Sequence, residues 1–218
     1  MLSFRFSAVD LTRLDRRHLL YGILVTWAVG LGRYWDHPDP YLVQSLGLGS
    51  LFVMGGLGLL LYLALLPLRP AGWSLLNLYT FLSLTALPAV LYAIPVEQFL
   101  SAGAARSANF WFLATVAVWR VAMLGRYLTC RTDLSGGLLV AALLLPLALI
   151  VVILTLLNLE KAVFDLMGGV RDSERTSNAE AYALLFLLSF YSFMASPVLA
   201  IAYGVAVWKR YRARRSAA

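Results

Sequence analysis

The residue best suited to bind a ligand is Arg120, a charged side chain inside a long apolar stretch. It lies 11 residues after Asn109, where that stretch begins, or about 16 Å along a helix. If the stretch crosses a bilayer, this depth is near the middle, where a charge is costly and usually faces the protein interior or a watery cavity. We therefore expect Arg120 to contact a lipid phosphate or a substrate carboxylate. Snorkelling toward the cytoplasmic surface is the structural alternative.

Few groups within the chain could neutralise Arg120, because no aspartate or glutamate lies deep within a predicted span. The remaining partners are backbone carbonyls, the polar side chains of Asn77 and Thr85, the acid Glu97 at the rim, or an anionic ligand. Asn77 and Thr85 are therefore predicted to share a site with Arg120.

A second candidate site is the predicted external rim, which carries Arg33, Asp36, His37, Glu97 and Glu160. Two acids and a histidine can in principle bind a metal or act as acid and base. However, Arg33 and Asp36 have the spacing of a plain ion pair, and the segment offers no obvious third metal ligand. A structural cap is the favoured interpretation, and no metal is predicted.

Motifs of several enzyme classes are missing from the chain. The segment Gly47–Leu51 lacks the glycine after serine that a rhomboid-like protease needs, and there is no HExxH, paired-glutamate or P-loop motif. The single cysteine, Cys130, excludes an intramolecular disulfide and a cysteine-built zinc site. No catalytic residue and no cofactor are predicted, and a non-catalytic protein is favoured over an enzyme.

Composition places these residues in a membrane protein. Apolar residues make up 61% of the chain and charged residues 13%, against roughly 45–50% and 25% in soluble domains. An all-α bundle of six transmembrane helices in a single domain is predicted, because six segments approach the roughly 20 apolar residues that a span needs. These segments run over about 18–35, 42–66, 73–94, 109–127, 138–159 and 181–208.

Basic residues predict the orientation of these spans. Twelve of the 18 lysines and arginines fall on the side that holds both termini, and five fall on the other side. The positive-inside rule then puts both termini in the cytoplasm of a multi-pass protein of the inner (plasma) membrane. This clustering at span ends also argues against nucleic acid as a partner. The external loop Glu160–Glu180 is predicted to hold a short interfacial helix.

Small residues mark possible packing faces on the second and sixth spans, where close helix contacts depend on small side chains. Prolines interrupt the third, fifth and sixth spans, at Pro88, Pro146 and Pro197. Broken helices of this kind can line a substrate cavity in transporters. The two small-residue faces consist of Ser45, Gly49 and Gly56 on the second span, and Ser192, Ser196, Ala200 and Gly204 on the sixth.

Residues 78–128 resemble the core of Yip1-type membrane proteins. The similarity rests on Ala86-Leu87-Pro88, on Ile94-Pro95 and on Trp111 and Trp119 in the next span. That family usually has five spans, whereas six are counted here. The resemblance implies a non-catalytic helical protein that acts through partners or lipids, and it transfers no functional residue.

The favoured function is therefore binding of an anionic lipid or of a partner membrane protein, with Arg120 as the anion contact. Two alternatives remain. The first is a small-solute transporter or substrate-binding membrane subunit whose proline-broken helices line a cavity. The second is an enzyme that acts on a lipid-linked substrate at the external rim.

Overall fold

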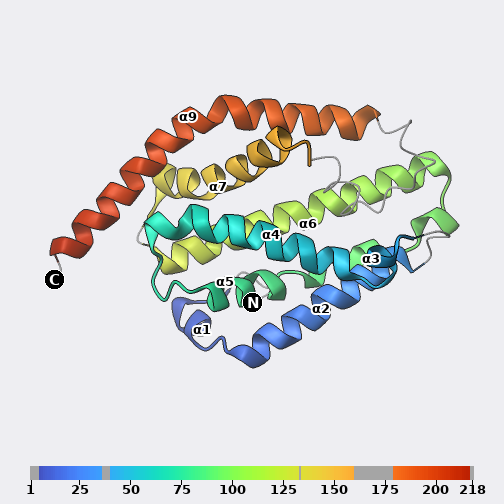
Figure 1. Ribbon diagram of the computed structural model, residues 1–218, viewed down its shortest axis with the longest axis horizontal. Helices are drawn as coiled ribbons and strands as arrows, with labels where there is room; N and C mark the ends of the chain where they lie inside the picture. Colours follow the sequence, from blue (N-terminus) through green and yellow to red (C-terminus); the bar gives the residue numbers. More distant parts are fainter. Residues whose placement is uncertain (1–4, 36–39, 133, 160–178, 217–218) are drawn as a thin grey trace.

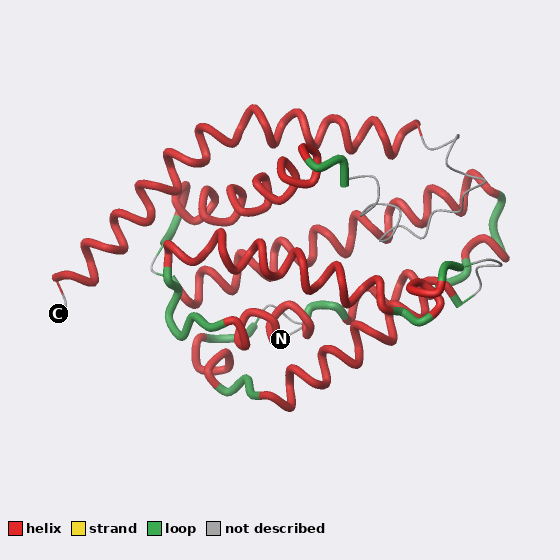
Figure 2. The backbone as a smooth tube through the Cα atoms, in the orientation of Figure 1, coloured by secondary structure: helices red, strands yellow, loops and turns green. Residues whose placement is uncertain are grey.

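The protein is a bundle of helices, and none of the residues described below forms a strand (Figures 1 and 2). The computed structural model describes residues 5–35, 40–132, 134–159 and 179–216. The interfacial helix predicted within 160–180 thus lies almost wholly outside the described residues. The elements are α1 Ala8–Thr12, α2 Arg16–Tyr34, α3 Leu42–Ser45, α4 Leu48–Leu65, η1 Leu66–Leu68, α5 Leu75–Leu84, η2 Leu87–Ala93, η3 Val96–Gln98, α6 Ala102–Arg131, α7 Gly136–Leu156 and α9 Ala179–Ser216.

Four stretches of the described chain are long and apolar enough to cross a membrane. They are Leu48–Leu68, Gly103–Arg131, Gly136–Leu156 and Leu185–Arg215. A fifth is added if the bent pair formed by α5 and the segment Leu87–Gln98 counts as one span. The prediction of an all-helical bundle with membrane-length apolar helices is therefore confirmed in this coarser form.

The first predicted span, residues 18–35, corresponds to α2 and does not meet the same criterion. Its 19 residues include Arg16 and Arg17 at one end and Arg33 at the other. These charges leave an apolar stretch that is shorter than the roughly 20 residues a typical span contains.

The third predicted span is broken at a proline. Helix α5 ends at Leu84, and the chain resumes as the 3₁₀ helix η2 at an angle of 45°. Pro88 has no backbone N–H to extend the hydrogen bonds of α5, and the N–H of Thr85 is shared between the carbonyls of Phe81 and Leu82. By contrast, α7 and α9 continue as helices through Pro146 and Pro197.

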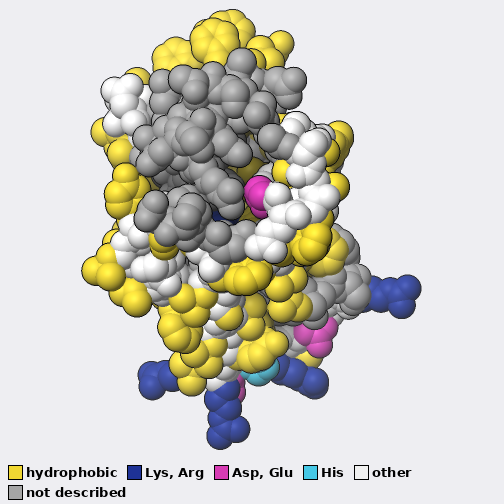
Figure 3. Space-filling model, turned by 90° about the vertical axis from the view of Figure 1, so that its right-hand side faces the viewer, with side chains coloured by type: hydrophobic (Ala, Val, Ile, Leu, Met, Phe, Trp, Pro, Cys, Tyr) yellow, Lys and Arg dark blue, Asp and Glu magenta, His cyan; other side chains and the backbone are white. Residues whose placement is uncertain are grey.

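The surface of the bundle is predominantly hydrophobic. Figure 3 shows apolar side chains over much of the described part of one face, with lysine and arginine side chains projecting from its lower part. On α9, Phe186, Val198 and Ile201 are each more than two-thirds exposed. Large apolar side chains pointing outward are expected where lipid surrounds a protein.

A large cluster of buried side chains joins the C-terminal parts of α4 and α6 to α5. The rings of Phe81 and Tyr127 lie 4.5 Å apart at its centre. The N-terminal segment folds against this core, because the carbonyl of Phe6 accepts a hydrogen bond of 3.1 Å from Arg126 Nη2. The core also contains Leu11, Leu65, Leu68, Leu78, Met123 and Leu128, all of which are almost fully buried.

Helix starts at this end are capped by local hydrogen bonds. At α1, the backbone N–H and the hydroxyl of Ser7 both donate to the Asp10 carboxylate at 2.8 Å. These bonds lower the pKa of Asp10, because they stabilise its charged form. At α2, the Asp15 carboxylate accepts from the N–H groups of Arg17 and His18. The capping fixes where the chain turns from α1 into α2.

Helix α2 is held to its neighbours by two close backbone approaches. A Cβ atom on Gly22 would lie 2.1 Å from Ser83 Oγ and 3.0 Å from the Ser83 carbonyl carbon. A Cβ atom on Gly30 would lie 2.3 Å from the carbonyl oxygen of Gly47. The structure thus places the tightest glycine contacts on α2, whereas the sequence pattern predicted them on the second and sixth spans.

The second and sixth spans, α4 and α9, do not form the expected close pair along these small residues. Helix α9 packs along α7, and α7 in turn packs against α4 (Figure 1). A Cβ atom on Gly56 or Gly204 would meet nothing within 4 Å. The intervening position of α7 is the physical reason why small residues at these positions do not bring α4 and α9 together.

Substitution of Gly22 tests the close approach of α2 to α5. The Gly22→Ala variant is expected to be less stable by about 1–3 kcal/mol, because its methyl group overpacks against Ser83. The matched Gly56→Ala variant is expected to keep or slightly raise stability, because it gains helix propensity in open space. Thermal unfolding of both variants in one detergent measures the difference. Equal midpoints for the two variants would contradict the contact.

Candidate functional site

A cavity of about 630 Å³ lies between the helices. Its lining comes from α2, α4, α5, η2, α6, α7 and α9, so nearly every long helix contributes a wall. The lining consists mainly of leucine, valine, isoleucine and alanine side chains, and the two cationic residues in it are Arg33 and Arg120. The volume falls within the range of about 300–1,000 Å³ that is usual for small-molecule sites.

Arg120 is supplied by the middle of α6 and lines the cavity. Its Nε atom is buried and has no hydrogen-bond partner among the described residues. A guanidinium presents five N–H donors and cannot shed its charge in a protein. A buried donor without a hydrogen-bond partner raises the free energy of the folded state. An acceptor that entered the cavity and bonded this N–H would remove that cost.

Arg33 reaches the same cavity from the C-terminal end of α2. Its guanidinium carbon lies 4.3 Å from the centre of the Tyr92 ring, which is a cation–π contact. Arg120 of α6 lines the same cavity. None of the described lining residues is an aspartate or glutamate, so the cavity combines concentrated positive charge with apolar walls.

The break in the third span contributes directly to this site. Thr85, Ala86 and Ala89, which flank the bend at Pro88, all line the cavity. The Thr85 hydroxyl donates to the carbonyl of Leu82 at 2.7 Å. This bond satisfies the hydroxyl hydrogen and leaves an acceptor oxygen, which cannot neutralise a guanidinium. Thr85 and Arg120 thus line the same cavity, and a contact between them stays a prediction.

Asn77, the other predicted neighbour of Arg120, lies elsewhere. Its amide donates to the carbonyl of Gly72 at 2.8 Å, and its backbone N–H is capped by Ser74. Asn77 therefore stabilises the turn that leads into α5, and it is not among the residues that line the cavity. Asn77 and Thr85 lie at opposite ends of α5, because Asn77 is in its first turn and Thr85 follows its last turn.

The rim residues are only partly covered by the structure. Glu97 accepts a hydrogen bond of 2.6 Å from the side-chain amide of Asn109, so it links η3 to the first part of α6. The predicted rim residues Asp36, His37 and Glu160 lie outside the described residues. Among the residues that the structure describes, no group of three or more histidines, cysteines and acids could hold a metal ion.

The small residues of the two predicted packing faces do not pack against each other; some line the cavity and others are exposed at the surface. Gly49 and Ser192 line the cavity, where their small side chains leave space between α4 and α9. The other polar members bond locally: Ser196 donates to the Ser192 carbonyl, and Ser45 donates to the Leu42 carbonyl. Ala200, Gly56 and Gly204 are exposed at the surface.

Sequence reasoning missed two features of the site. Arg33 was placed at the external rim, but its side chain lines the cavity. Tyr92, whose ring packs on Arg33, was not singled out at all. Its position four residues after Pro88 was the available signal, because a chain redirected by a proline bend can bring a following side chain against a neighbouring helix.

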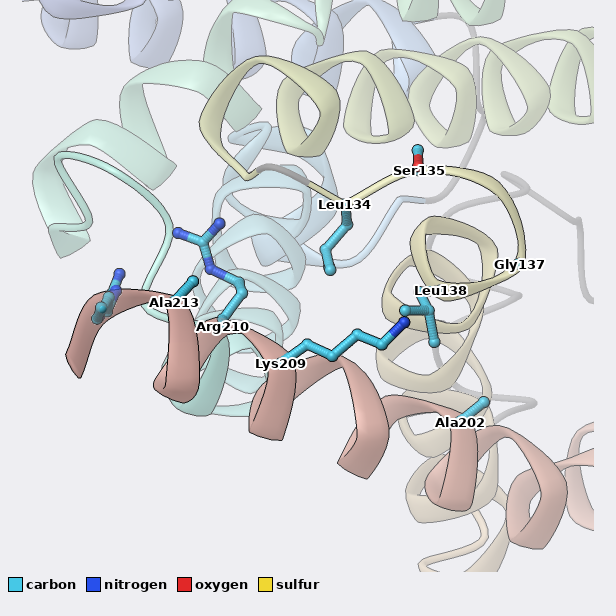
Figure 4. A pocket seen from close by; sticks show the side chains of 9 residues that line it. Leu134, Ser135, Gly137, Leu138, Ala202, Lys209, Arg210 and Ala213 are labelled. Atoms are coloured by element: carbon cyan, nitrogen blue, oxygen red, sulfur yellow. The ribbon is translucent and has the colours of Figure 1, made fainter. Parts of the chain in front are cut away.

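A second, larger hollow of about 900 Å³ lies between the start of α7 and the C-terminal part of α9 (Figure 4). It is lined by Lys209, Arg210 and Arg214 together with Leu134 and Leu138. The arginines here already have acceptors: Arg210 Nε donates to the Leu68 carbonyl at 3.0 Å, and Arg214 bonds the Arg69 carbonyl. The central cavity is therefore the stronger candidate, because its Arg120 Nε lacks an acceptor.

Removal of the Arg120 charge tests whether this side chain is structural. The Arg120→Met variant is expected to be more stable than the wild type without ligand, by about 1–3 kcal/mol, because an unsatisfied buried donor is removed. Thermal unfolding in detergent measures the change. The Leu124→Met variant, one turn away on the same wall, should shift stability by less than about 1.5 kcal/mol. A lower midpoint for Arg120→Met than for Leu124→Met would show that Arg120 stabilises the fold.

Comparisons with known proteins do not add a residue to this site. No protein-family model, curated protein or solved structure matches the chain. The similarity of residues 78–128 to Yip1-type proteins therefore stays a prediction, and the site is described by its own chemistry.

Proposed function

We propose that the protein is a non-catalytic integral membrane protein that binds an anionic lipid in its central cavity, with Arg120 as the contact to the headgroup. The observation that carries this proposal is the buried Nε of Arg120, which has no acceptor among the described residues and belongs to a side chain lining a mainly apolar cavity. An anionic headgroup supplies the missing acceptor and neutralises the charge. The apolar walls suit a hydrocarbon tail.

The proposal includes six spans, with α2 as the first and both termini in the cytoplasm. Support for α2 comes from its close backbone contacts with Ser83 of α5 and with Gly47 at the start of α4. A helix packed this tightly against membrane-length neighbours is expected to lie beside them in the bilayer. The excess of lysine and arginine near both ends of the chain supports the orientation in a plasma (inner) membrane.

Reporter fusions test this topology. A green fluorescent protein fused at either terminus is expected to fluoresce in bacterial cells, and alkaline phosphatase at either terminus is expected to be inactive, because both ends face the cytoplasm. Fusions of the same reporters after Gln98, in the predicted second external loop, serve as the opposite-side control. An active phosphatase at one terminus only would show an odd number of spans.

Ligand binding tests the role of Arg120. Protein in phosphatidylcholine nanodiscs is expected to bind tetradecyl phosphate in preference to tetradecylphosphocholine, which has the same tail and no net charge. The Arg120→Gln variant is expected to bind tetradecyl phosphate about tenfold or more weakly, because a charge-assisted hydrogen bond is lost. Isothermal calorimetry measures both affinities. The exposed Arg13→Gln variant is the matched control, and equal affinity in Arg120→Gln and Arg13→Gln would contradict the proposal.

Transport of a small solute is a second candidate function. The observation that favours it is the bend between α5 and η2, because residues on both sides of this break line the cavity. Broken helices at a central cavity occur in transporters. The apolar lining makes a lipid the better fit, since a small polar solute would leave most of the walls without a hydrogen-bonding role.

A further inference from the structure

The hollow between the start of α7 and the C-terminal part of α9 has a chemistry different from that of the central cavity. Its lining combines the basic side chains of Lys209 and Arg214 with the apolar side chains of Leu134 and Leu138. We propose that this hollow binds an anionic phospholipid, with Lys209 and Arg214 in contact with the phosphate of its headgroup. The site is separate from the cavity around Arg120, and it does not depend on the function proposed for that cavity.

The position of the hollow follows from the charge pattern of α9. No charged residue occurs from Leu185 to Trp208, whereas five lysines and arginines and no acid occur from Lys209 to Arg215. A basic cluster directly after an apolar stretch of membrane length marks where a helix leaves the hydrocarbon and meets the headgroups. Trp208, which is half exposed, stands at this boundary, as aromatic residues commonly do. For a membrane-crossing α9, the hollow therefore lies at a bilayer surface in either orientation.

The basic wall of the hollow is one face of α9. Four residues of this helix segment line it: Lys209, Arg210, Ala213 and Arg214. Their spacing of i, i+1, i+4 and i+5 puts them on the same side of a helix. Arg210 donates to the Leu68 carbonyl and has further contacts of its own. The contact with the phosphate is therefore assigned to Lys209 and Arg214.

Lys209 and Arg214 favour an anionic partner. Among the residues that the structure describes, neither has an ion-pair partner, and none of the lining residues is acidic. Arg214 bonds the carbonyl of Arg69, which is uncharged and leaves the positive charge in place. The acid next to this lining in the sequence is Asp133, which lies outside the described residues, and a single acid cannot balance the five basic residues of 209–215. The charge at this surface is complementary to that of an anionic headgroup.

The apolar part of the hollow lies toward the membrane-length stretch of α9. Ala202, which also lines it, precedes Lys209 by seven residues, or about 10 Å along the helix. Figure 4 shows Leu134 and Leu138 pointing from the α7 side toward α9, with the end of the Lys209 side chain beside Leu138. Along α9 the lining thus changes from apolar to basic in the direction that leaves the membrane. A phospholipid has the same order of polarity, with its chains inside and its phosphate at the surface.

This order of polarity favours a lipid over a soluble anion. A free phosphate would use the two cations, but it would leave the wall formed by Leu134, Leu138 and Ala202 without an apolar contact. A phospholipid covers both parts of the hollow. It is also already held at this level of the bilayer, so that binding costs it less translational freedom than it costs a soluble ligand.

Native mass spectrometry of the protein in detergent measures the affinity for the first bound phospholipid. Phosphatidylglycerol is expected to bind about tenfold or more tightly than phosphatidylcholine with the same chains, because each basic residue near the surface contributes about a fivefold attraction to anionic lipid. The measurement is made on the wild type and on Arg120→Gln, in which the central cavity lacks its proposed anion contact. The preference for phosphatidylglycerol should persist in Arg120→Gln.

Charge variants test the assignment to Lys209 and Arg214. The double variant Lys209→Gln/Arg214→Gln is expected to lose most of the preference for phosphatidylglycerol. The matched double variant Arg16→Gln/Arg17→Gln removes the same charge from exposed positions at the start of α2 and should keep the preference. Thermal unfolding is the second readout: phosphatidylglycerol should raise the midpoint of the wild type and of the matched variant, but not that of Lys209→Gln/Arg214→Gln.

A steric variant distinguishes a discrete site from attraction spread over the surface. Ala202→Phe places a large apolar side chain in the hollow without changing any charge, and it should weaken binding of phosphatidylglycerol severalfold. Val198→Phe is the matched control, because Val198 is on the same helix, is 70% exposed and is not among the lining residues. Its affinity for phosphatidylglycerol should equal that of the wild type.

Each contrary outcome overturns a stated part of the proposal. Equal affinity for phosphatidylglycerol and phosphatidylcholine would overturn the anionic site. An equal loss in the two double variants, or an unchanged affinity in Ala202→Phe, would overturn the discrete hollow in favour of diffuse attraction. Loss of the preference in Arg120→Gln alone would overturn this site and leave the central cavity as the lipid site. Binding of sn-glycerol 1-phosphate as tight as that of phosphatidylglycerol would overturn the lipid in favour of a soluble anion.

Discussion

The structure depends on the free energy of holding a guanidinium inside an apolar bundle. A charge in this setting is stable only if solvent, a counter-charge or a set of acceptors reaches it. Arg120 is surrounded by leucine, valine and alanine side chains, and its Nε has no acceptor within the described residues. The described part of the protein therefore provides no hydrogen-bond acceptor for this buried Nε. This buried donor, at a side chain that lines a cavity, is the reason for proposing a ligand there.

A packed core and the cavity that contains Arg120 lie next to each other in the bundle. At one end, the aromatic and leucine core around Phe81 and Tyr127 is nearly fully buried and joins α4, α5, α6 and the N-terminal segment. The cavity adjoins this core, because Leu61 and Leu124 belong to the core and also line the cavity. The packed core thus forms part of the cavity wall, and the bend at Pro88 contributes Thr85, Ala86 and Ala89 to it.

Much of the fold was accessible from the sequence, because hydrophobic length is a local property. The apolar segments that predict the second to sixth spans correspond to helices, but of the three prolines predicted to interrupt spans only Pro88 lies at a break, because α7 and α9 continue through Pro146 and Pro197. The site was less accessible, because it depends on which helices are neighbours. Spacing shows that Gly56 and Gly204 lie on helix faces, but only the fold shows that they meet open space. Arg33 could be placed at the end of α2 but not inside the cavity, since that depends on contact with η2.

The close approach of Gly22 to Ser83 bears on how the chain is assembled during synthesis. Helix α2 emerges first and has arginines at both ends, so its own partition into hydrocarbon is weakly favourable. One of its two close contacts, the Gly47 carbonyl, follows Gly30 by 17 residues, whereas the other, Ser83 on α5, emerges about sixty residues after Gly22. If α2 enters the bilayer as proposed, it gains most of its anchoring only when that later segment arrives. Helix α2 is then stabilised in two steps, first by the segment around Gly47 and later by α5, before α6, α7 and α9 have emerged.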